Sequence, residues 1–205
     1  RQMCIRDRAR LKFSGTAYEE KVGFATQTEF GKGFVYLRDF YFDFNLSAPI
    51  TLTVGQFKKP FLRQELTGDE KLEFVDRSIA NTALGGGRDI GLMLHNKFTS
   101  SPSVEWAIGI FNGTSDKPAV KANPDSGVVG SSNVPDYAYP LVVARLGYNT
   151  EGNDGYTEAD LKGGGLRAGV GASLAQSFGA DDNDAHRTTS VEFDANLKLS
   201  GLALS

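Results

Sequence analysis

The chain has 205 residues, with 22 Lys and Arg against 25 Asp and Glu, and so a formal net charge of −3. This near balance lacks the basic footprint of a nucleic-acid-binding domain, so we expect no nucleic-acid partner. No run approaches the roughly 18 consecutive apolar residues of a membrane-spanning helix, so any membrane role must rest on β-strands.

The first residues look foreign to the rest of the chain. Residues 1–8 include MCIRDR, which resembles an in-frame translation of a sequencing adapter and has no signal-peptide pattern. We interpret 1–8 as an artefact that contains the only cysteine, Cys4, so we expect no disulfide and no thiolate metal site. Since the chain stops in the middle of an alternating pattern, we expect 9–205 to be a fragment of one larger β-domain.

Strand signals then follow one another along the chain. In 34–46, Phe40, Phe42 and Phe44 alternate with polar residues, so the three rings share one face of a strand. About nine segments of roughly 8–13 residues show such patterns, near the ~9–11 residues that cross a bilayer at a tilt. The expected strands are 9–17, 21–30, 34–46, 49–57, 89–96, 104–111, 141–148, 166–176 and 189–199.

The connections between these segments alternate in length. Short turns such as 47–49 and 99–103 alternate with long polar segments such as 113–136. Short turns on one rim and long loops on the other are typical of outer-membrane barrels. A soluble sheet can also alternate, but apolar faces on strand after strand favour a lipid-facing wall. The side chains predicted to be exposed on a convex face are Phe40, Phe42, Phe44, Trp106, Ile108, Val170 and Leu174.

Residues 58–88 break this rhythm. The segment has mixed charges but too many apolar residues for a disordered tract, so it should pack against something. One interpretation is a surface excursion that covers a sheet edge. The other, which we favour, is a loop folded into a barrel lumen, with helical turns in 76–84 ended by three glycines. Residues expected to pack on the inner wall are Leu66, Leu72, Phe74 and Ile79.

Several motifs occur here in a family-specific order. They are VGQFKKPF at 54–61, ELT at 65–67, FVDRS at 74–78, GRDIG at 87–91 and GIFNG at 109–113, with RL at 10–11 and RDFY at 38–41 before them. Over 9–148 the chain thereby resembles the phosphate-selective porin O/P family. The resemblance implies an all-β antiparallel meander, part of a transmembrane barrel of 16 strands with one inward-folded loop. It also implies a bacterial outer-membrane location, outer-membrane lipid as a partner and assembly as a homotrimer.

Candidate residues for an anion pathway follow from the faces of the early strands and from the cations of the long segment. Acids and cations on the expected inner face nearly cancel, so the face count alone shows no cationic ring. We expect selectivity to come from a basic stripe on the early strands that faces cations of the long segment, weakened by nearby acids. A competing interpretation is that these charges form salt bridges within the wall. The candidates are Arg10, Lys12, Lys21, Lys58, Lys59, Lys71, Arg77 and Arg88.

No pattern in the chain indicates catalysis. His95 and His186 are the only histidines, and neither a nucleophile motif nor metal-ligand spacing accompanies them, so we expect no enzyme, no metal and no cofactor. The favoured hypothesis is a passive outer-membrane channel for small anions such as phosphate. The alternatives are a general or other-solute porin, a soluble β-sandwich or lectin-like binding module, and an outer-membrane lipid hydrolase.

Overall fold

The computed structural model describes residues 9–31, 34–74, 76–85, 87–113, 121–122, 129–130, 140–153, 155–160, 162–178 and 188–204. The expected adapter segment 1–8 and most of the polar segment 113–136 lie outside these ranges. Among the described residues, no helix is long and apolar enough to cross a membrane.

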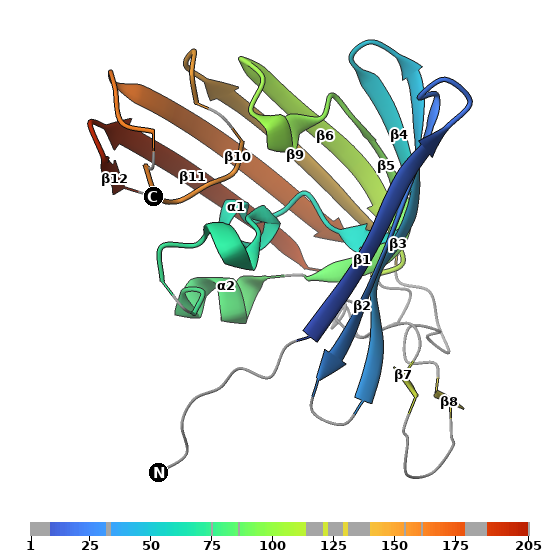
Figure 1. The fold of residues 1–205 in the computed structure, drawn as a ribbon. Coiled ribbons are helices and arrows are strands. Elements are labelled where there is room, and N and C mark those ends of the chain that lie inside the picture. Colours follow the sequence, from blue (N-terminus) through green and yellow to red (C-terminus); the bar gives the residue numbers. More distant parts are fainter. Residues whose placement is uncertain are drawn as a thin grey trace, which may run out of the picture.

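Ten strands form one antiparallel meander, in the order β1-β2-β3-β4-β5-β6-β9-β10-β11-β12 (Figure 1). They are β1 (Ala9–Ala17), β2 (Val22–Gly31), β3 (Phe34–Ser47), β4 (Ile50–Lys58), β5 (Arg88–His95), β6 (Val104–Phe111), β9 (Leu141–Asn149), β10 (Arg167–Ser177), β11 (Thr189–Leu199) and β12 (Leu202–Leu204). The all-β prediction is confirmed, and each of the nine expected strands lies within one residue of its predicted ends. The short strand β12 was not predicted.

The remaining elements are short. A two-strand hairpin, β7 (Lys121–Ala122) and β8 (Val129–Gly130), attaches to β3. The helical elements are α1 (Arg63–Leu66), η1 (Asp69–Lys71), α2 (Ile79–Leu84) and η2 (Phe98–Ser100).

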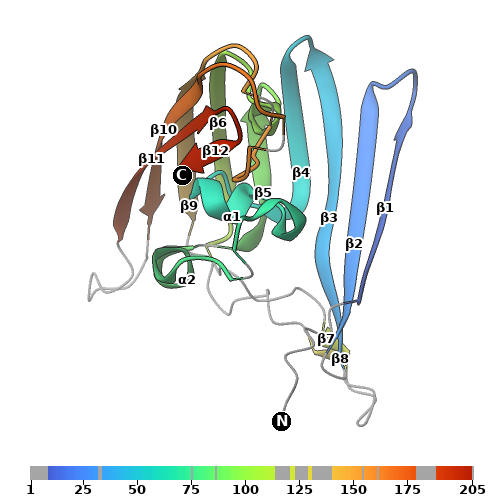
Figure 2. The same cartoon turned by 60° about the vertical axis from the view of Figure 1, so that its left-hand side comes forward.

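The sheet curves into a deep trough, with β1 and β12 at its two ends (Figures 1 and 2). In the described residues these end strands do not pair with each other, so the sheet stays open. A curved antiparallel meander of tilted strands is the architecture of a partial barrel.

The convex face of the trough is apolar. Of the seven side chains predicted to be exposed there, six are between 38% and 55% exposed. The exception is Trp106, which is less exposed than the others and is half-buried. Contiguous apolar surface of this extent is rare on soluble monomers. The β-sandwich alternative requires a second sheet over the Phe40 face, and the described residues contain one sheet only.

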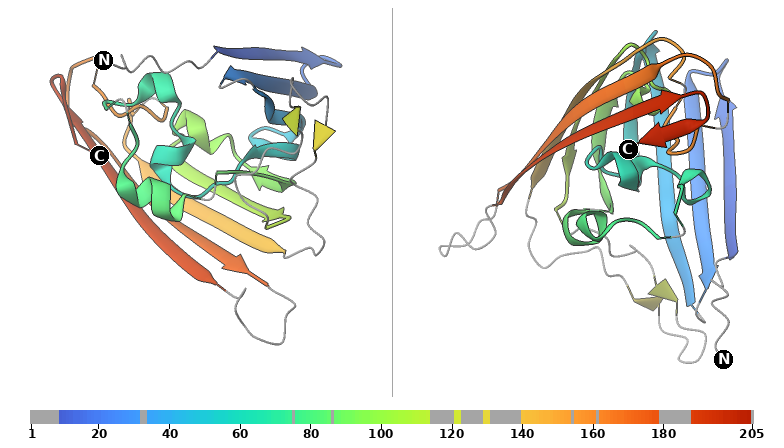
Figure 3. Two further views of the ribbon diagram at one scale, coloured as in Figure 1. Left: turned by 90° about the horizontal axis from the view of Figure 1, so that it is seen from below. Right: turned by 90° about the vertical axis from the view of Figure 1, so that its left-hand side faces the viewer.

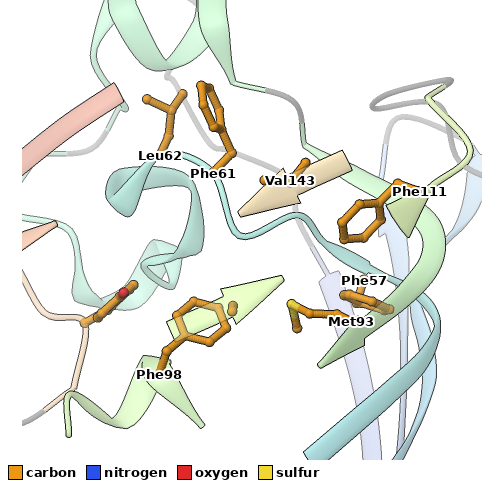
Figure 4. Close-up of a cluster of buried hydrophobic side chains, with 9 residues drawn as sticks. Phe57, Phe61, Leu62, Met93, Phe98, Phe111 and Val143 are labelled. Carbon is orange, nitrogen blue, oxygen red and sulfur yellow. The ribbon is translucent and has the colours of Figure 1, made fainter. Parts of the chain in front are cut away.

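The hydrophobic core lies on the concave side (Figure 4). Phe57, Met93, Phe111 and Val143 project from β4, β5, β6 and β9, and Phe61 from the start of the long connection packs with them. Each such side chain contributes about 1.5–3 kcal/mol on burial. The core therefore joins the inner wall to the long connection rather than one sheet to another.

The β4–β5 connection, which we call the inward segment (59–87), lies inside the trough, with α1 and α2 within the curve of the strands (Figure 3). The prediction of an inward-folded loop is confirmed, as is a short helix that ends at glycine, here Gly85. This helix begins at Ile79. Ser78 caps its N-terminus, because the Ser78 side chain accepts a hydrogen bond from the backbone N–H of Asn81.

For two of the four apolar residues of this segment, the prediction that they pack on the inner wall is wrong. Leu66 packs against the core and Leu72 is half-buried, but Phe74 is 72% and Ile79 is 88% exposed. The reason is that α2 turns its polar side inward, where Asn81 donates to Glu65 Oε2 at 2.9 Å. A residue two positions earlier on a helix points roughly 200° away, so Ile79 faces outward.

Candidate functional site

A cavity of about 1070 Å³ lies between the inner faces of β1–β5 and the inward segment. Side chains of the turn that contains η2 also contribute to its wall. Six of the eight candidate residues line this cavity: Arg10, Lys12, Lys58, Lys71, Arg77 and Arg88.

The other two candidates lie elsewhere. Lys21 ends the turn between β1 and β2 and is exposed at the rim. Lys59 does not line the cavity and is buried, with its Nζ 3.9 Å from Asp89 Oδ2. Lys58 therefore lines the cavity while the adjacent Lys59 does not, because neighbouring residues near a strand end point in different directions.

Two cations of the lining, Arg38 and Lys97, were missed by the sequence reasoning. Strict alternation in β3 places Arg38 on the same face as Phe40, which is the outer face. The β2–β3 register shifts here, with Gln27 opposite Asp39 and Thr28 opposite Leu37, so Arg38 is the extra residue of a β-bulge. A bulge breaks the alternation and re-aims a side chain.

The β4 motif supports this bulge. Gln56 Nε2 donates to the backbone carbonyls of Leu37 and Arg38, at 2.9 and 2.8 Å. The preceding Gly55 has φ +135°, and a Cβ there would lie 2.2 Å from the carbonyl oxygen of Phe40. Glycine is the residue that tolerates such a backbone conformation and so close an approach. The Gly-Gln pair therefore serves the geometry of the cavity wall.

The cavity lining carries an excess of positive charge. Its eight basic and five acidic side chains leave three positive charges, opposite in sign to the −3 of the whole chain. The basic residues are Arg10, Lys12, Arg38, Lys58, Lys71, Arg77, Arg88 and Lys97, and the acidic ones are Asp39, Asp43, Glu65, Asp69 and Glu70.

A chain of ion pairs runs from the wall to the inward segment. Glu29 Oε2 lies 2.8 Å from Arg38 Nε and 3.1 Å from Arg10 Nε. Asp69 continues the chain, because its two oxygens each lie 2.8 Å from an arginine, Arg10 on β1 and Arg77 on the inward segment. Arg10 and Arg77 thus meet through a shared carboxylate, and part of their charge is offset.

Three lysines of the lining differ from these arginines. Lys12, Lys71 and Lys97 are exposed to the cavity, and their side chains form no ion pair or hydrogen bond with the described part of the chain. An ammonium group with no carboxylate partner keeps its full charge available to a solute.

Another group of cations gathers where β4 and β5 meet the inward segment. Lys58 Nζ donates to the backbone carbonyls of Glu65 and Thr67, at 2.6 and 3.3 Å. Arg77 Nη2 donates to the same Thr67 oxygen at 2.9 Å, so these two cations are near neighbours. Arg88 lies opposite Lys58 in the β4–β5 register and forms two bonds to Asp39, at 2.8 and 3.1 Å. This cluster holds three cations, of which Arg77 also pairs with Asp69 and Arg88 pairs with Asp39.

No group of three or more His, Cys, Asp or Glu residues within the described ranges is placed to hold a metal ion. The cavity lining presents basic, acidic and hydrogen-bonding side chains. An excess of basic side chains in such a lining attracts anions.

Comparison with known proteins adds one finding. A family model described as phosphate-selective porin O and P matches residues 4–185. This match extends beyond the motifs of 9–148, into β10 and the residues that follow it. No curated protein and no solved structure matches the chain.

Proposed function

Because the chain belongs to the phosphate-selective porin O and P family, we propose that it forms a passive channel for small anions such as phosphate in the bacterial outer membrane. The observation that carries this proposal is the cavity on the concave face, whose lining has eight basic and five acidic side chains. The apolar convex face supports the location, because a lipid-facing wall needs such a surface.

The arrangement suggests how an anion would pass. Lys12, Lys71 and Lys97 supply unshielded charge along the cavity, and low-dielectric walls focus the field of a few closely set cations. The cluster of Lys58, Arg77 and Arg88 then offers several N–H donors where the inward segment narrows the path. Planar guanidinium groups suit the oxygens of phosphate.

Acids beside this path limit the selectivity. Asp69 and Glu65 lie within ion-pair distance of Arg77, and Asp39 pairs with Arg88. These pairs favour a modest anion preference, and they are the observation on which the general-porin alternative rests.

We further propose that 9–205 is part of a barrel of 16 strands that assembles as a homotrimer, with outer-membrane lipid around it. Within the described residues the outer edge of β1 is unpaired, which supports a longer barrel, since a long exposed edge strand is a template for pairing with another strand.

The test is the reversal potential of the full-length protein in planar lipid bilayers under a salt gradient. We expect anion preference in the wild type and its loss in the variant Lys12→Gln/Lys71→Gln/Lys97→Gln. Lys21→Gln is the matched control, because this lysine lies on the exposed rim outside the cavity, and it should leave the potential unchanged. A wild type without anion preference would support the general porin, and the absence of channels would overturn the proposal.

A further inference from the structure

The β9–β10 connection, residues 150–166, departs from the layout of a porin wall. In a meander its ends lie on the same rim as the turns that follow β1, β3 and β5, which are short. Yet Asn153, Tyr156, Glu158 and Asp160 within it are each at most 8% exposed. Long connections on this rim are unusual in such barrels, and buried polar residues in one need partners.

Part of this connection is fastened to the inner wall. Tyr156 donates to Glu105 Oε1 of β6 at 2.7 Å and accepts from Arg145 Nε of β9 at 2.9 Å. Burial, helped by the Glu105 carboxylate, raises the pKa of Tyr156, so its hydroxyl stays protonated and able to donate. Asn153 donates to Asn149 Oδ1 at 2.9 Å. These contacts place Asn153 and Tyr156 against β6 and β9.

The same connection is also hydrogen-bonded to the inward segment. Glu158 Oε2 accepts from the backbone N–H of Glu73 at 2.8 Å, and Oε1 accepts from Gln64 Nε2 at 3.0 Å. The N–H of Glu158 donates to the carbonyl of Lys71 at 3.0 Å. The guanidinium of Arg63 lies 4.1 Å from the centre of the Tyr156 ring. Two segments far apart in the sequence thus meet inside the trough.

The inner wall is open at β1 and closed around β6 and β9, while Thr51 and Thr53 of β4 line the cavity although they are also buried. Inward-facing residues of β6, β9, β10 and β11 are closed off: Glu105, Arg145, Ser173 and Asn196 are between 0% and 3% exposed. None of these strands lines the cavity, which is bounded by β1–β5, the η2 turn and the inward segment. On β1, by contrast, Lys12 and Ser14 are open to solvent.

We propose that residues 150–160 form a second inward segment that fills the β6–β11 side of the lumen and holds the first one in place. Within the described strands, the open path is then confined to the β1–β5 side. Glu158 is the positioning residue, because its carboxylate and its N–H bind three groups of the first segment. This proposal rests on the proposed channel function, but its geometry is tested without measuring conduction.

The first experiment compares two cysteines on the inner face, one on each side. In full-length protein in outer-membrane vesicles, we expect a membrane-impermeant thiol reagent to modify Ser14→Cys quickly. Ser173→Cys, which replaces the same residue type, should react at least about a hundredfold more slowly, because reaction there needs local opening. Equal rates at both sites would overturn the divided lumen, whatever the channel recordings show.

The second experiment tests the role of Glu158. Added to Ser173→Cys, Glu158→Ala should raise the labelling rate about tenfold, because losing bonds to a carboxylate eases local opening. Hydrogen exchange of the Glu73 amide should accelerate as well. Glu151→Ala is the matched control, an exposed acid of the same connection, and should change neither rate.

Circular dichroism of each variant separates loss of the contact from loss of the fold. Unchanged labelling and exchange in folded Glu158→Ala would show that this residue does not position the inward segment. A channel with no anion preference but with protected Ser173→Cys would contradict the proposed function and leave the divided lumen standing.

Discussion

Asp69 illustrates how a single side chain can tune the cavity. Its two carboxylate oxygens each bind one arginine at 2.8 Å, Arg10 from the wall and Arg77 from the inward segment. The pairing both holds the segment to the wall and removes positive field from the lumen. These two effects can be separated by a substitution that keeps the shape of the side chain and removes its charge.

We predict that Asp69→Asn increases the anion preference of the channel. An amide offers one acceptor and no negative charge, so Arg10 and Arg77 act more strongly on a passing anion. Reversal potentials in a salt gradient measure the change. Asp76→Asn, on the same segment but outside the cavity lining, is the control and should have no effect. A lower anion preference in Asp69→Asn would mean that holding the segment matters more than its charge.

Asp160, in the β9–β10 connection, is a second single side chain with a clear effect. Its carboxylate accepts hydrogen bonds from the backbone N–H groups of Gly201 and Gly163 and from Arg167 Nη2, at 2.9, 3.1 and 2.6 Å. These bonds, that from Gly201 first and then that from Arg167, hold the pKa of Asp160 below its ordinary value of 3.8. The ionised form is therefore favoured in the folded protein.

The sign of this shift predicts a pH dependence. A lowered pKa contributes stability that is present above pH 3.8 and is lost as the pH falls through the folded-state value. Protection of the Gly201 amide from hydrogen exchange should hold at neutral pH and decline only below that value. Asp160→Asn should remove this acid step. Persistence of the step in Asp160→Asn would assign it to another group.

At the scale of elements, the inward segment is attached by an apolar anchor and a polar network. Phe61 is 5% exposed and packs in the core beside β4 and β9, whereas Phe74 further along is 72% exposed. The segment thus offers two phenylalanines in opposite environments. Their comparison isolates the contribution of burial from that of residue type.

Phe61→Ala should lower the free energy of unfolding by about 3–5 kcal/mol, the usual cost of truncating a buried phenylalanine. Phe74→Ala should change it by less than about 0.5 kcal/mol, as for exposed positions. Urea-induced unfolding of the full-length protein in lipid vesicles provides both values. Equal losses would mean that Phe74 is covered in the native channel.

At the scale of the whole molecule, the outer and inner faces carry opposite chemistry. Leu146 in the middle of β9 is 63% exposed on the convex side, while Arg145 beside it is buried on the concave side. In water this is the reverse of a stable arrangement. It is the arrangement required when lipid lies outside and a polar lumen inside.

Leu146→Arg should therefore destabilise the protein in a bilayer by about 2–4 kcal/mol, the cost of a cation on the lipid face near the midplane. Leu146→Phe, which stays apolar, should be tolerated. Folding into lipid vesicles followed by circular dichroism measures both. If Leu146→Arg folded as well as the wild type, the convex face would not be in contact with lipid.

The sequence alone determined the strands and their faces. Alternation with period two is a local property, so the nine expected strands and the apolar convex face could be predicted from neighbouring residues. The packing of the inward segment against the wall could also be predicted, because its apolar content is too high for an exposed loop. Arg10 and Lys12 reach the cavity because strand parity sets their side, whereas Lys71 and Arg77 reach it with the inward segment.

What only the tertiary structure decided is which side chains meet. The bulge at Arg38 interrupts the alternation of side chains along β3, and no pattern of neighbouring residues signals it. Asp69 joins Arg10 of β1 to Arg77 of the inward segment. The inward turn of 150–160 depends on Glu158, whose partners lie 85 and 94 residues away in the sequence. A pattern of neighbouring residues encodes the direction of a side chain, but charge pairing and burial depend on distances that exist only once the sheet has curved.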